Sequence, residues 1–107
     1  MKRGDLVPVV LAGAHGKPRP ALIIQSDLFA SHPSVTVLPV TTELRPIVTF
    51  RIAVNPSQKN GLRMPSQIMV DKAHTIPRDK AGAPFGELEP RTLREVDRSL
   101  AVFLGIG

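Results

Sequence analysis

Arg19 has the sequence setting that most favours chemistry. It lies between Pro18 and Pro20, directly before an apolar run at residues 21–25. Each proline fixes its own φ angle and restrains the residue before it, so the arginine would project from a stiffened backbone. A guanidinium held in this way offers a fork of N–H donors that matches phosphate oxygens. A surface arginine in a proline-rich turn explains the same residues equally well.

Hydroxyl, amide and carboxylate side chains mark two further junctions. Thr41 and Thr42 follow the apolar run at residues 35–40, and Ser66 and Gln67 open a run that ends at Asp71. Threonines at the end of a strand often only cap a turn. A hydroxyl beside an arginine can also hold a phosphate by hydrogen bonding. These junctions, together with Arg19, carry the candidate site residues.

Other catalytic and metal-binding patterns are missing from the sequence. The chain has no cysteine, which excludes a disulfide framework, a thiolate zinc site and a cysteine nucleophile. His15, His32 and His74 lie far apart and lack the spacing of metal-ligand clusters. Residues 13–16 lack the spacing and ending of a phosphate-binding loop, and no Gly-x-Ser-x-Gly nucleophile motif occurs. The sequence therefore predicts no metal ion and no cofactor.

The composition predicts one small basic domain, residues 1–107. The chain has 42% hydrophobic residues but only four Phe and no Tyr or Trp, so Val, Ile and Leu must fill its core. Base stacking, the usual device of single-strand binders, has few aromatic side chains to use. The net charge of +5 suits a nucleic acid or an acidic protein partner, although solubility also explains it. The apolar N-terminal stretch is too short to span a membrane, so we expect a cytoplasmic protein without membrane association.

Short apolar runs separated by turn residues predict a series of strands. The expected strands cover residues 5–11, 21–25, 35–40, 47–54, 67–71, 74–76 and 86–88, and residues 26–31 could form one helical turn. The continuous run at 21–25 is typical of a strand buried on both faces. Residues 47–54 alternate instead, which predicts a half-buried strand. The apolar face of that strand would carry Val48, Phe50, Ile52 and Val54.

The hydrophobic period changes near the C-terminus. Apolar residues recur there three or four positions apart, at Leu93, Val96, Leu100 and Phe103. This spacing predicts one face of a helix, for which Pro90 suits the first turn and Gly105 the end. The expected fold class is therefore mainly β (α+β): a small, strongly bent antiparallel sheet or barrel with short helical turns and one C-terminal helix.

The motifs at these junctions resemble, in their order, those of the MazF/PemK (Kid) family of toxin ribonucleases. The matching segments are Lys-Arg-Gly-Asp at 2–5, Arg-Pro-Ala-Leu-Ile-Ile-Gln at 19–25, Leu-Pro-Val-Thr at 38–41, Gly-Leu at 61–62, Ser-Gln-Ile-Met-Val-Asp-Lys at 66–72, His-Thr-Ile-Pro at 74–77 and the terminal helix. These segments span essentially the whole chain. No single one is decisive, but the ordered set is specific.

This resemblance implies an SH3-like antiparallel barrel of the CcdB/MazF/Kid type with a C-terminal helix, working as a homodimer. It implies a toxin of a type II toxin–antitoxin system, an mRNA interferase that cleaves single-stranded RNA at selected sequences without a metal. The products would carry a 2′,3′-cyclic phosphate and a 5′-hydroxyl. A cognate antitoxin would place a flexible acidic segment in the RNA groove, in agreement with the basic charge of this chain.

By position, the resemblance assigns the catalytic roles to Arg19 and Thr41. Arg19 would stabilise the pentavalent phosphate and is a candidate proton donor to the leaving oxygen, while Thr41 would complete the site. Because the RNA 2′-hydroxyl is the nucleophile, the protein needs to supply only positioning, charge stabilisation and proton transfer. An arginine is effectively always protonated and is a poor acid, so we favour its electrostatic role.

Two departures from the family pattern leave the rest of the site open. Several relatives have a longer first loop than residues 13–16, so base preference does not transfer, and His15 is only a candidate for the histidine that some relatives use as a base. Some relatives also have an arginine where this chain has Met69, so an arginine–aspartate pair with Asp71 is missing here. The general base is therefore unassigned. The candidate substrate-binding residues are His15, Lys17, Thr42, Arg63, Ser66, Gln67 and Asp71.

Two alternatives to a ribonuclease stay open. A non-nuclease relative of the same fold, resembling CcdB, would poison gyrase through protein contacts and would not need the pair of Arg19 and Thr41. An SH3-like module that only binds nucleic acid would be expected to show more aromatic residues. For the homodimer, we expect the terminal helix and the strand at residues 47–54 to contribute to the interface.

Overall fold

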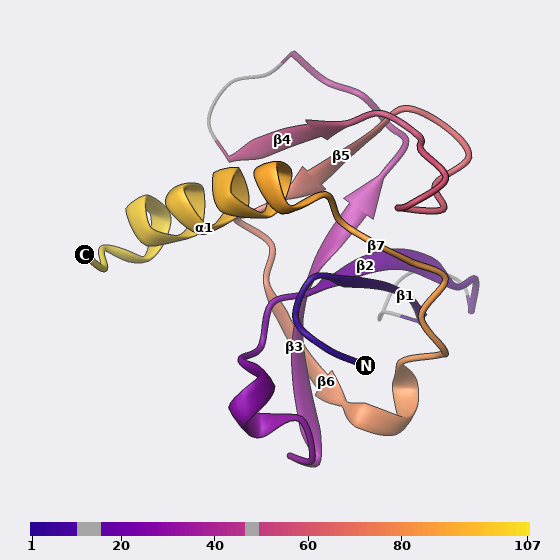
Figure 1. Ribbon diagram of the computed structural model, residues 1–107, viewed down its shortest axis with the longest axis vertical. Helices are drawn as coiled ribbons and strands as arrows, with labels where there is room; N and C mark the ends of the chain where they lie inside the picture. The colour runs from indigo at the N-terminus through magenta and orange to yellow at the C-terminus, as the bar shows by residue number, and fades with distance from the viewer. Residues whose placement is uncertain (11–15, 47–49) are drawn as a thin grey trace.

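The protein folds into a curled antiparallel sheet with one C-terminal helix (Figure 1). The computed structural model describes residues 1–10, 16–46 and 50–107. The elements are β1 (Asp5–Val9), β2 (Arg19–Ile23), the 3₁₀ turn η1 (Asp27–Phe29), β3 (Ser34–Thr41), β4 (Arg51–Val54), β5 (Ser66–Met69), β6 (His74–Pro77), the 3₁₀ turn η2 (Arg78–Lys80), β7 (Gly86–Glu87) and α1 (Pro90–Leu104).

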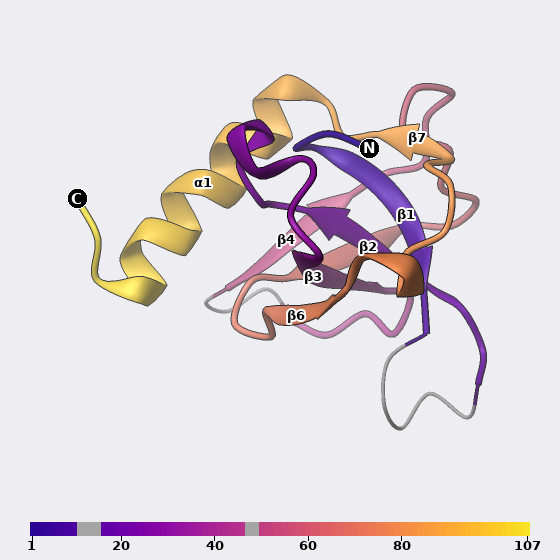
Figure 2. The same ribbon diagram turned by 90° about the horizontal axis from the view of Figure 1, so that it is seen from below.

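β3 is the strand that connects the two parts of the sheet. The strand order is β4-β5-β3-β2-β1-β7, and β6 also pairs with β3. The first part of β3 lies between β2 and β6, whereas its last two residues, Val40 and Thr41, pair with Ile68 and Gln67 of β5. One eight-residue strand therefore belongs to both parts of the sheet, which curls into a half-barrel with α1 along one side (Figure 2). This confirms the predicted fold class.

The core is almost entirely aliphatic and lies on both faces of the central strands. One cluster between the sheet and α1 contains Leu6, Leu22, Leu38, Val40, Val54, Ile68, Val70, Leu88, Val96 and Leu100. A second cluster on the other face contains Val7, Val9, Ala21, Ile23, Val35 and Val37. Neighbouring residues of β1, β2 and β3 thus point into different clusters, as the alternation along a strand requires. The predicted two-sided burial of residues 21–25 is confirmed for residues 21–23, whereas β2 ends at Ile23 and the next two residues are only half-buried.

α1 begins and ends where its sequence predicts. Pro90 occupies the first turn, where its missing N–H costs nothing. Gly105 has a φ of 73°, and the N–H of the next residue, Ile106, donates to Ala101 O at 2.8 Å, which completes a left-handed C-cap. Val96 and Leu100 are buried against the sheet. The helix thereby closes the open side of the half-barrel.

The predicted strand at residues 47–54 is confirmed for residues 51–54, and residues 47–49 lie outside the described residues. β4 begins only at Arg51, because Phe50 has a φ of 69° and belongs to a turn. The predicted apolar face holds where it is described: Val54 is buried, while Phe50 and Ile52 are half-buried against the core. The ring of Phe50 also meets Phe103 of α1 edge to face, with centroids 4.9 Å apart.

Strand ends differ from the prediction at the first hairpin. β2 begins at Arg19, two residues before the apolar run, because Val9 of β1 pairs with Arg19 and Pro8 pairs with Pro20. β1 ends at Val9 rather than at residue 11, which lies outside the described residues. Within the described ranges, no helix combines the length and apolar character needed to cross a membrane.

Candidate active site

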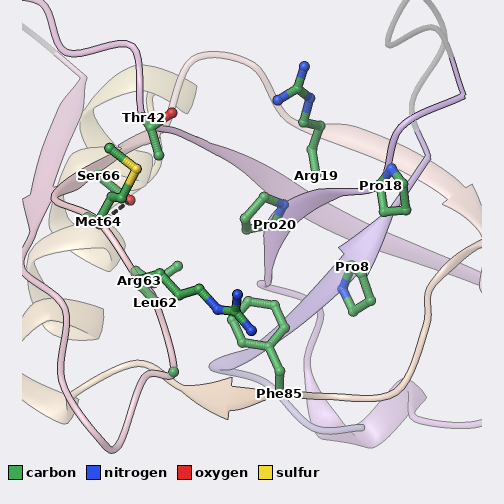
Figure 3. A pocket seen from close by; sticks show the side chains of 11 residues that line it. Pro8, Pro18, Arg19, Pro20, Thr42, Leu62, Arg63, Met64, Ser66 and Phe85 are labelled. Atoms are coloured by element: carbon green, nitrogen blue, oxygen red, sulfur yellow. Dashed lines mark hydrogen bonds between the residues drawn. The ribbon is translucent and has the colours of Figure 1, made fainter.

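Arg19, the first residue of β2, lies at the rim of a pocket (Figure 3). Its backbone is fixed by pairing with Val9, and Pro18 and Pro20 on either side line the same pocket. The guanidinium is exposed to solvent, and no described residue accepts a hydrogen bond from it. Arg19 therefore combines a rigid attachment with donors that are available to a ligand.

The pocket brings five separate segments of the chain together. It has a volume of about 610 Å³ and is mostly apolar. The residues that line it are Pro8, Pro18, Arg19, Pro20, Thr42, Gly61, Leu62, Arg63, Met64, Ser66 and Phe85. Of the candidates from the sequence, Arg19, Thr42, Arg63 and Ser66 thus meet at one site. Two guanidinium groups beside an apolar surface suit a ligand that carries both phosphates and flat apolar groups.

The two threonines after β3 have different positions. Thr41 is the last residue of β3, and its hydroxyl accepts a hydrogen bond from Glu43 N at 3.0 Å. It therefore caps the turn after the strand and does not line the pocket. Thr42 is exposed and lines the pocket (Figure 3).

Ser66 and Gln67, on β5, form hydrogen bonds to the backbone of segments beside the pocket. Ser66 is buried, and its hydroxyl donates to Met64 O at 2.8 Å. Gln67 is buried too: its Oε1 accepts from Arg45 N at 3.2 Å, and its Nε2 donates to Arg45 O at 2.9 Å. Both side chains are engaged within the protein. Gln67 holds the segment that follows Thr42, so it acts on the pocket through that loop.

Arg51 is a residue of this region that sequence reasoning missed. Its Nη1 donates to Gln67 Oε1 at 2.7 Å and to Glu43 O at 3.0 Å, and its Nη2 donates to Met69 Sδ at 3.6 Å. Arg51 stands opposite Met69 in the pairing of β4 with β5. Arg51 thus brings a guanidinium beside Met69 from the neighbouring strand. Only the register of β4, which the sequence left open, could have revealed it.

The remaining candidates lie away from the pocket lining. Asp71 follows β5, where its carboxylate accepts from Lys72 Nζ at 2.8 Å. This hydrogen bond lowers the pKa of Asp71, with a contribution from the positive charge of Arg51. Lys17 is exposed two residues before Arg19 and is not part of the lining. His15 lies outside the described residues.

A buried polar cluster supports the wall formed by residues 61–64. Asn60 is fully buried, and its Oδ1 accepts from Ser57 N and Leu62 N, both at 3.0 Å. Its Nδ2 donates to Asn55 O at 2.9 Å and to the Glu89 carboxylate at 3.2 Å. Ser57 Oγ donates to the same carboxylate at 2.5 Å. The Asn-Gly dipeptide at 60–61 is a turn signal in the sequence, but nothing there indicated its partner thirty residues away.

Hydrogen bonds and burial shift the pKa of Glu89 in opposite directions. Burial opposes its negative charge, but hydrogen bonds from Ser57 and Asn60 outweigh that effect and lower the pKa of the carboxyl. Glu89 is also the residue directly before α1, where a negative charge interacts favourably with the helix dipole. Among the described residues, no group of three or more His, Asp or Glu side chains is placed to hold a metal ion.

Comparisons with known proteins show the family to which the chain belongs. Residues 2–104 match the family described as PemK-like, MazF-like toxin of type II toxin-antitoxin system. The chain is 43% identical over 107 residues to a probable endoribonuclease MazF of Mycolicibacterium smegmatis, covering 99% of this chain and 98% of that protein.

Solved structures show the same architecture. An endoribonuclease in complex with its cognate antitoxin from a mycobacterial species superimposes with a TM-score of 0.84 at 25% identity, covering 100% of this chain and 97% of that one. The Mycobacterium tuberculosis toxin MazF-mt6 superimposes with a TM-score of 0.81 at 26% identity, covering 96% of this chain and 98% of that one. The chain thus belongs to the PemK-like, MazF-like toxin family of type II toxin–antitoxin systems, as a MazF-type endoribonuclease.

Proposed function

We propose that this chain cleaves single-stranded RNA, including mRNA, at selected sequences and without a metal ion, and that Arg19 stabilises the reacting phosphate. The observation that carries this proposal is the exposed guanidinium of Arg19, held by a paired strand at the rim of a pocket that also holds Thr42 and Arg63. A rigidly placed cation is most effective where negative charge develops in the transition state.

The reaction needs little chemistry from the protein. The 2′-oxygen of the ribose attacks the adjacent phosphorus, the bond to the 5′-oxygen breaks, and a 2′,3′-cyclic phosphate forms. The proton of the 2′-hydroxyl goes to a base, and the leaving 5′-oxygen takes up a proton to become a 5′-hydroxyl. Arg19 would neutralise the extra charge on the pentavalent phosphate. Its role is electrostatic, because a guanidinium stays protonated near neutral pH and releases protons poorly.

The two threonines would have different roles: Thr42 in binding and Thr41 in positioning. We propose that Thr42 contacts the phosphate, because it lines the pocket with Arg19. Thr41 completes the site by capping the turn that presents Thr42. Gln67 and Ser66 act in the same way on the two walls, through their bonds to Arg45 and Met64.

The other candidate residues would extend the RNA-binding surface beyond the surroundings of Arg19. Arg63, in the pocket lining, and Lys17, two residues before Arg19, are exposed cations that would bind neighbouring phosphates. His15, two residues before Lys17 in the sequence, and Asp71, after β5, are further candidate contacts. The basic balance of the chain, +5, also suits an antitoxin whose flexible acidic segment competes with RNA for this surface. We expect the protein to act in the cytoplasm, where mRNA is located.

The end of α1 supports the proposal of a homodimer. Large apolar side chains are exposed there, at Val102, Phe103, Leu104 and Ile106. Contiguous exposed apolar residues at one end of a helix commonly mark a protein interface. A second copy of the chain is the partner that the predicted interface of the terminal helix and β4 requires, and Phe103 already meets Phe50 beside β4.

Incubation with a long single-stranded RNA in EDTA tests the function. We expect wild-type protein to give discrete fragments with 5′-hydroxyl ends. The Arg19→Ala variant should leave the RNA intact, whereas Arg94→Ala, which removes an exposed arginine of α1, should cleave as wild type. Cleavage only with added metal would contradict the metal-independent mechanism. Intact RNA together with gyrase inhibition would support the CcdB-like alternative, and binding without cleavage would support a nucleic-acid-binding module.

A further inference from the structure

Phe85 is the one aromatic residue that lines the pocket. The chain has four Phe and no Tyr or Trp, and all four Phe lie within the described residues. Phe50 and Phe103 pack against each other, and Phe29 lies on η1. Phe85 is 41% exposed at the pocket, on the segment before β7 (Figure 3). Neither the family motifs nor the residues around Arg19 account for an exposed ring at this place.

The backbone on both sides of Phe85 is tightly fixed. Phe85 N donates to Leu6 O at 2.9 Å, which ties the segment to β1. A Cβ atom on Gly61 would lie 2.6 Å from Phe85 O and 3.0 Å from its ring atom Cδ1. A Cβ atom on Gly86 would lie only 2.2 Å from Asn60 O. The two glycines therefore allow residues 59–61 and 85–86 to pack directly against each other, and the base of the ring is held in place.

The surroundings of the ring combine apolar and cationic groups. Pro8, Pro20 and Leu62 line the same pocket and keep it apolar. Arg63 extends in the direction of Phe85 in Figure 3, and Arg19 lies at the opposite rim. A flat apolar surface between two cations is complementary to a nucleotide, which has a flat base and phosphates on both sides.

We propose that Phe85 is a stacking platform for one unpaired base of the RNA, next to the phosphate at Arg19. This inference rests on the proposed function, and it adds a binding residue to that site. Every base has a π-face, so stacking on an aromatic ring contributes affinity with little preference among bases. Loss of the ring should therefore weaken RNA binding at all cleavage sites and leave the choice of sites unchanged.

Variants at two phenylalanines isolate the contribution of the ring. Phe85→Leu removes the ring but keeps an apolar side chain against Gly61, and Phe85→Tyr keeps the ring. Phe29→Leu removes an exposed ring outside the pocket and serves as the control. The probe is a short RNA that spans a mapped cleavage site and carries a 2′-deoxyribose at the cut, so that it binds but lacks the nucleophile. We expect Phe85→Leu to bind it about 5- to 100-fold more weakly, and the other two variants to bind as wild type within about threefold.

Abasic nucleotides placed one at a time on either side of the cut identify the stacked base. At one position, the abasic probe should weaken wild-type binding and cause little further loss in Phe85→Leu, because the two changes remove the same contact. The inference is overturned if Phe85→Leu binds as wild type, if no abasic position weakens wild-type binding, or if the two losses multiply at every position. Wild-type protein that cuts RNA in these cases leaves the proposed function standing. Wild-type protein that neither cuts nor binds RNA overturns both.

Discussion

The side-chain amide of Asn60 donates to the Glu89 carboxylate at 3.2 Å and joins the wall of the pocket to the start of α1. The side-chain amide of Asn60 makes four hydrogen bonds although the residue is fully buried, and Ser57 binds the same carboxylate. Residues 61–64, which line the pocket, directly follow this cluster. The position of that wall therefore depends on one buried amide.

Replacing Asn60 should destabilise the fold. Asn60→Ala leaves the N–H groups of Ser57 and Leu62 without their acceptor and removes a donor to Glu89. We expect the free energy of unfolding to fall by about 2–4 kcal/mol, since each buried group left without a partner costs about 1–3 kcal/mol. Urea-induced unfolding measures this change in the free energy of unfolding. Gln58→Ala, an exposed change in the same loop, should stay within about 0.5 kcal/mol. Equal stability of the two variants would contradict the structural role of Asn60.

Glu89 should make stability depend on acid pH. Its folded-state pKa lies below the usual value of 4.5, because Ser57 and Asn60 stabilise the charged form despite burial. The unfolded state thus binds the proton more readily, so the stabilisation is present above the unfolded pKa and is lost as pH falls through the folded pKa. Glu89→Gln should flatten the decline of unfolding free energy below about pH 5. Glu95→Gln, an exposed change on α1, serves as the control, and an equal flattening there would contradict the prediction.

Arg51 should influence catalysis without touching RNA. Its guanidinium bridges Gln67 and Glu43 O, which fixes the turn after Thr42. Arg51→Lys keeps the charge but cannot hold both acceptors with the same planar fork. We expect kcat to fall about tenfold or more with KM nearly unchanged, because small misplacements of site groups are costly. Arg98→Lys on α1 should leave both constants unchanged. A rise in KM alone would indicate direct RNA contact by Arg51 instead.

A charge at the end of α1 should separate the proposed homodimer. Leu104 and Val102 are 57% and 73% exposed, and burial of such side chains would drive association. Leu104→Asp should sediment as a monomer at micromolar concentration, whereas Leu28→Asp, on η1, should sediment as wild type. A monomeric wild-type protein would contradict the proposed dimer.

The sequence predicts the local elements well but leaves their partners open. Alternation and apolar spacing predicted the two-sided burial of residues 21–23 and the buried face of α1, because both follow from the geometry of one element. The prediction that Phe50 belongs to the strand at residues 47–54 was wrong, because a positive φ angle leaves no mark in a hydrophobic pattern.

Residues of the site were predicted more reliably than their contacts. The stiffened position of Arg19 follows from its two prolines, and the structure places it at the pocket. The roles of Gln67, Arg51 and Asn60 depend on contacts across strands or between distant loops. Such contacts are set by register and packing, which single-sequence patterns do not specify. The same limit applies to Thr41 and Thr42, since their adjacency conceals which of them lines the pocket.

The single-turnover cleavage rate of Arg19 variants tests the central claim most directly. RNA is mixed with excess wild-type, Arg19→Lys or Arg19→Ala protein in EDTA, and affinity is measured in parallel on the 2′-deoxy probe. If Arg19 stabilises the phosphate of the transition state, Arg19→Ala should slow cleavage by about 100-fold or more while weakening binding far less, with Arg19→Lys between the two. An Arg19→Ala variant that cleaves within about threefold of the wild-type rate would contradict the account.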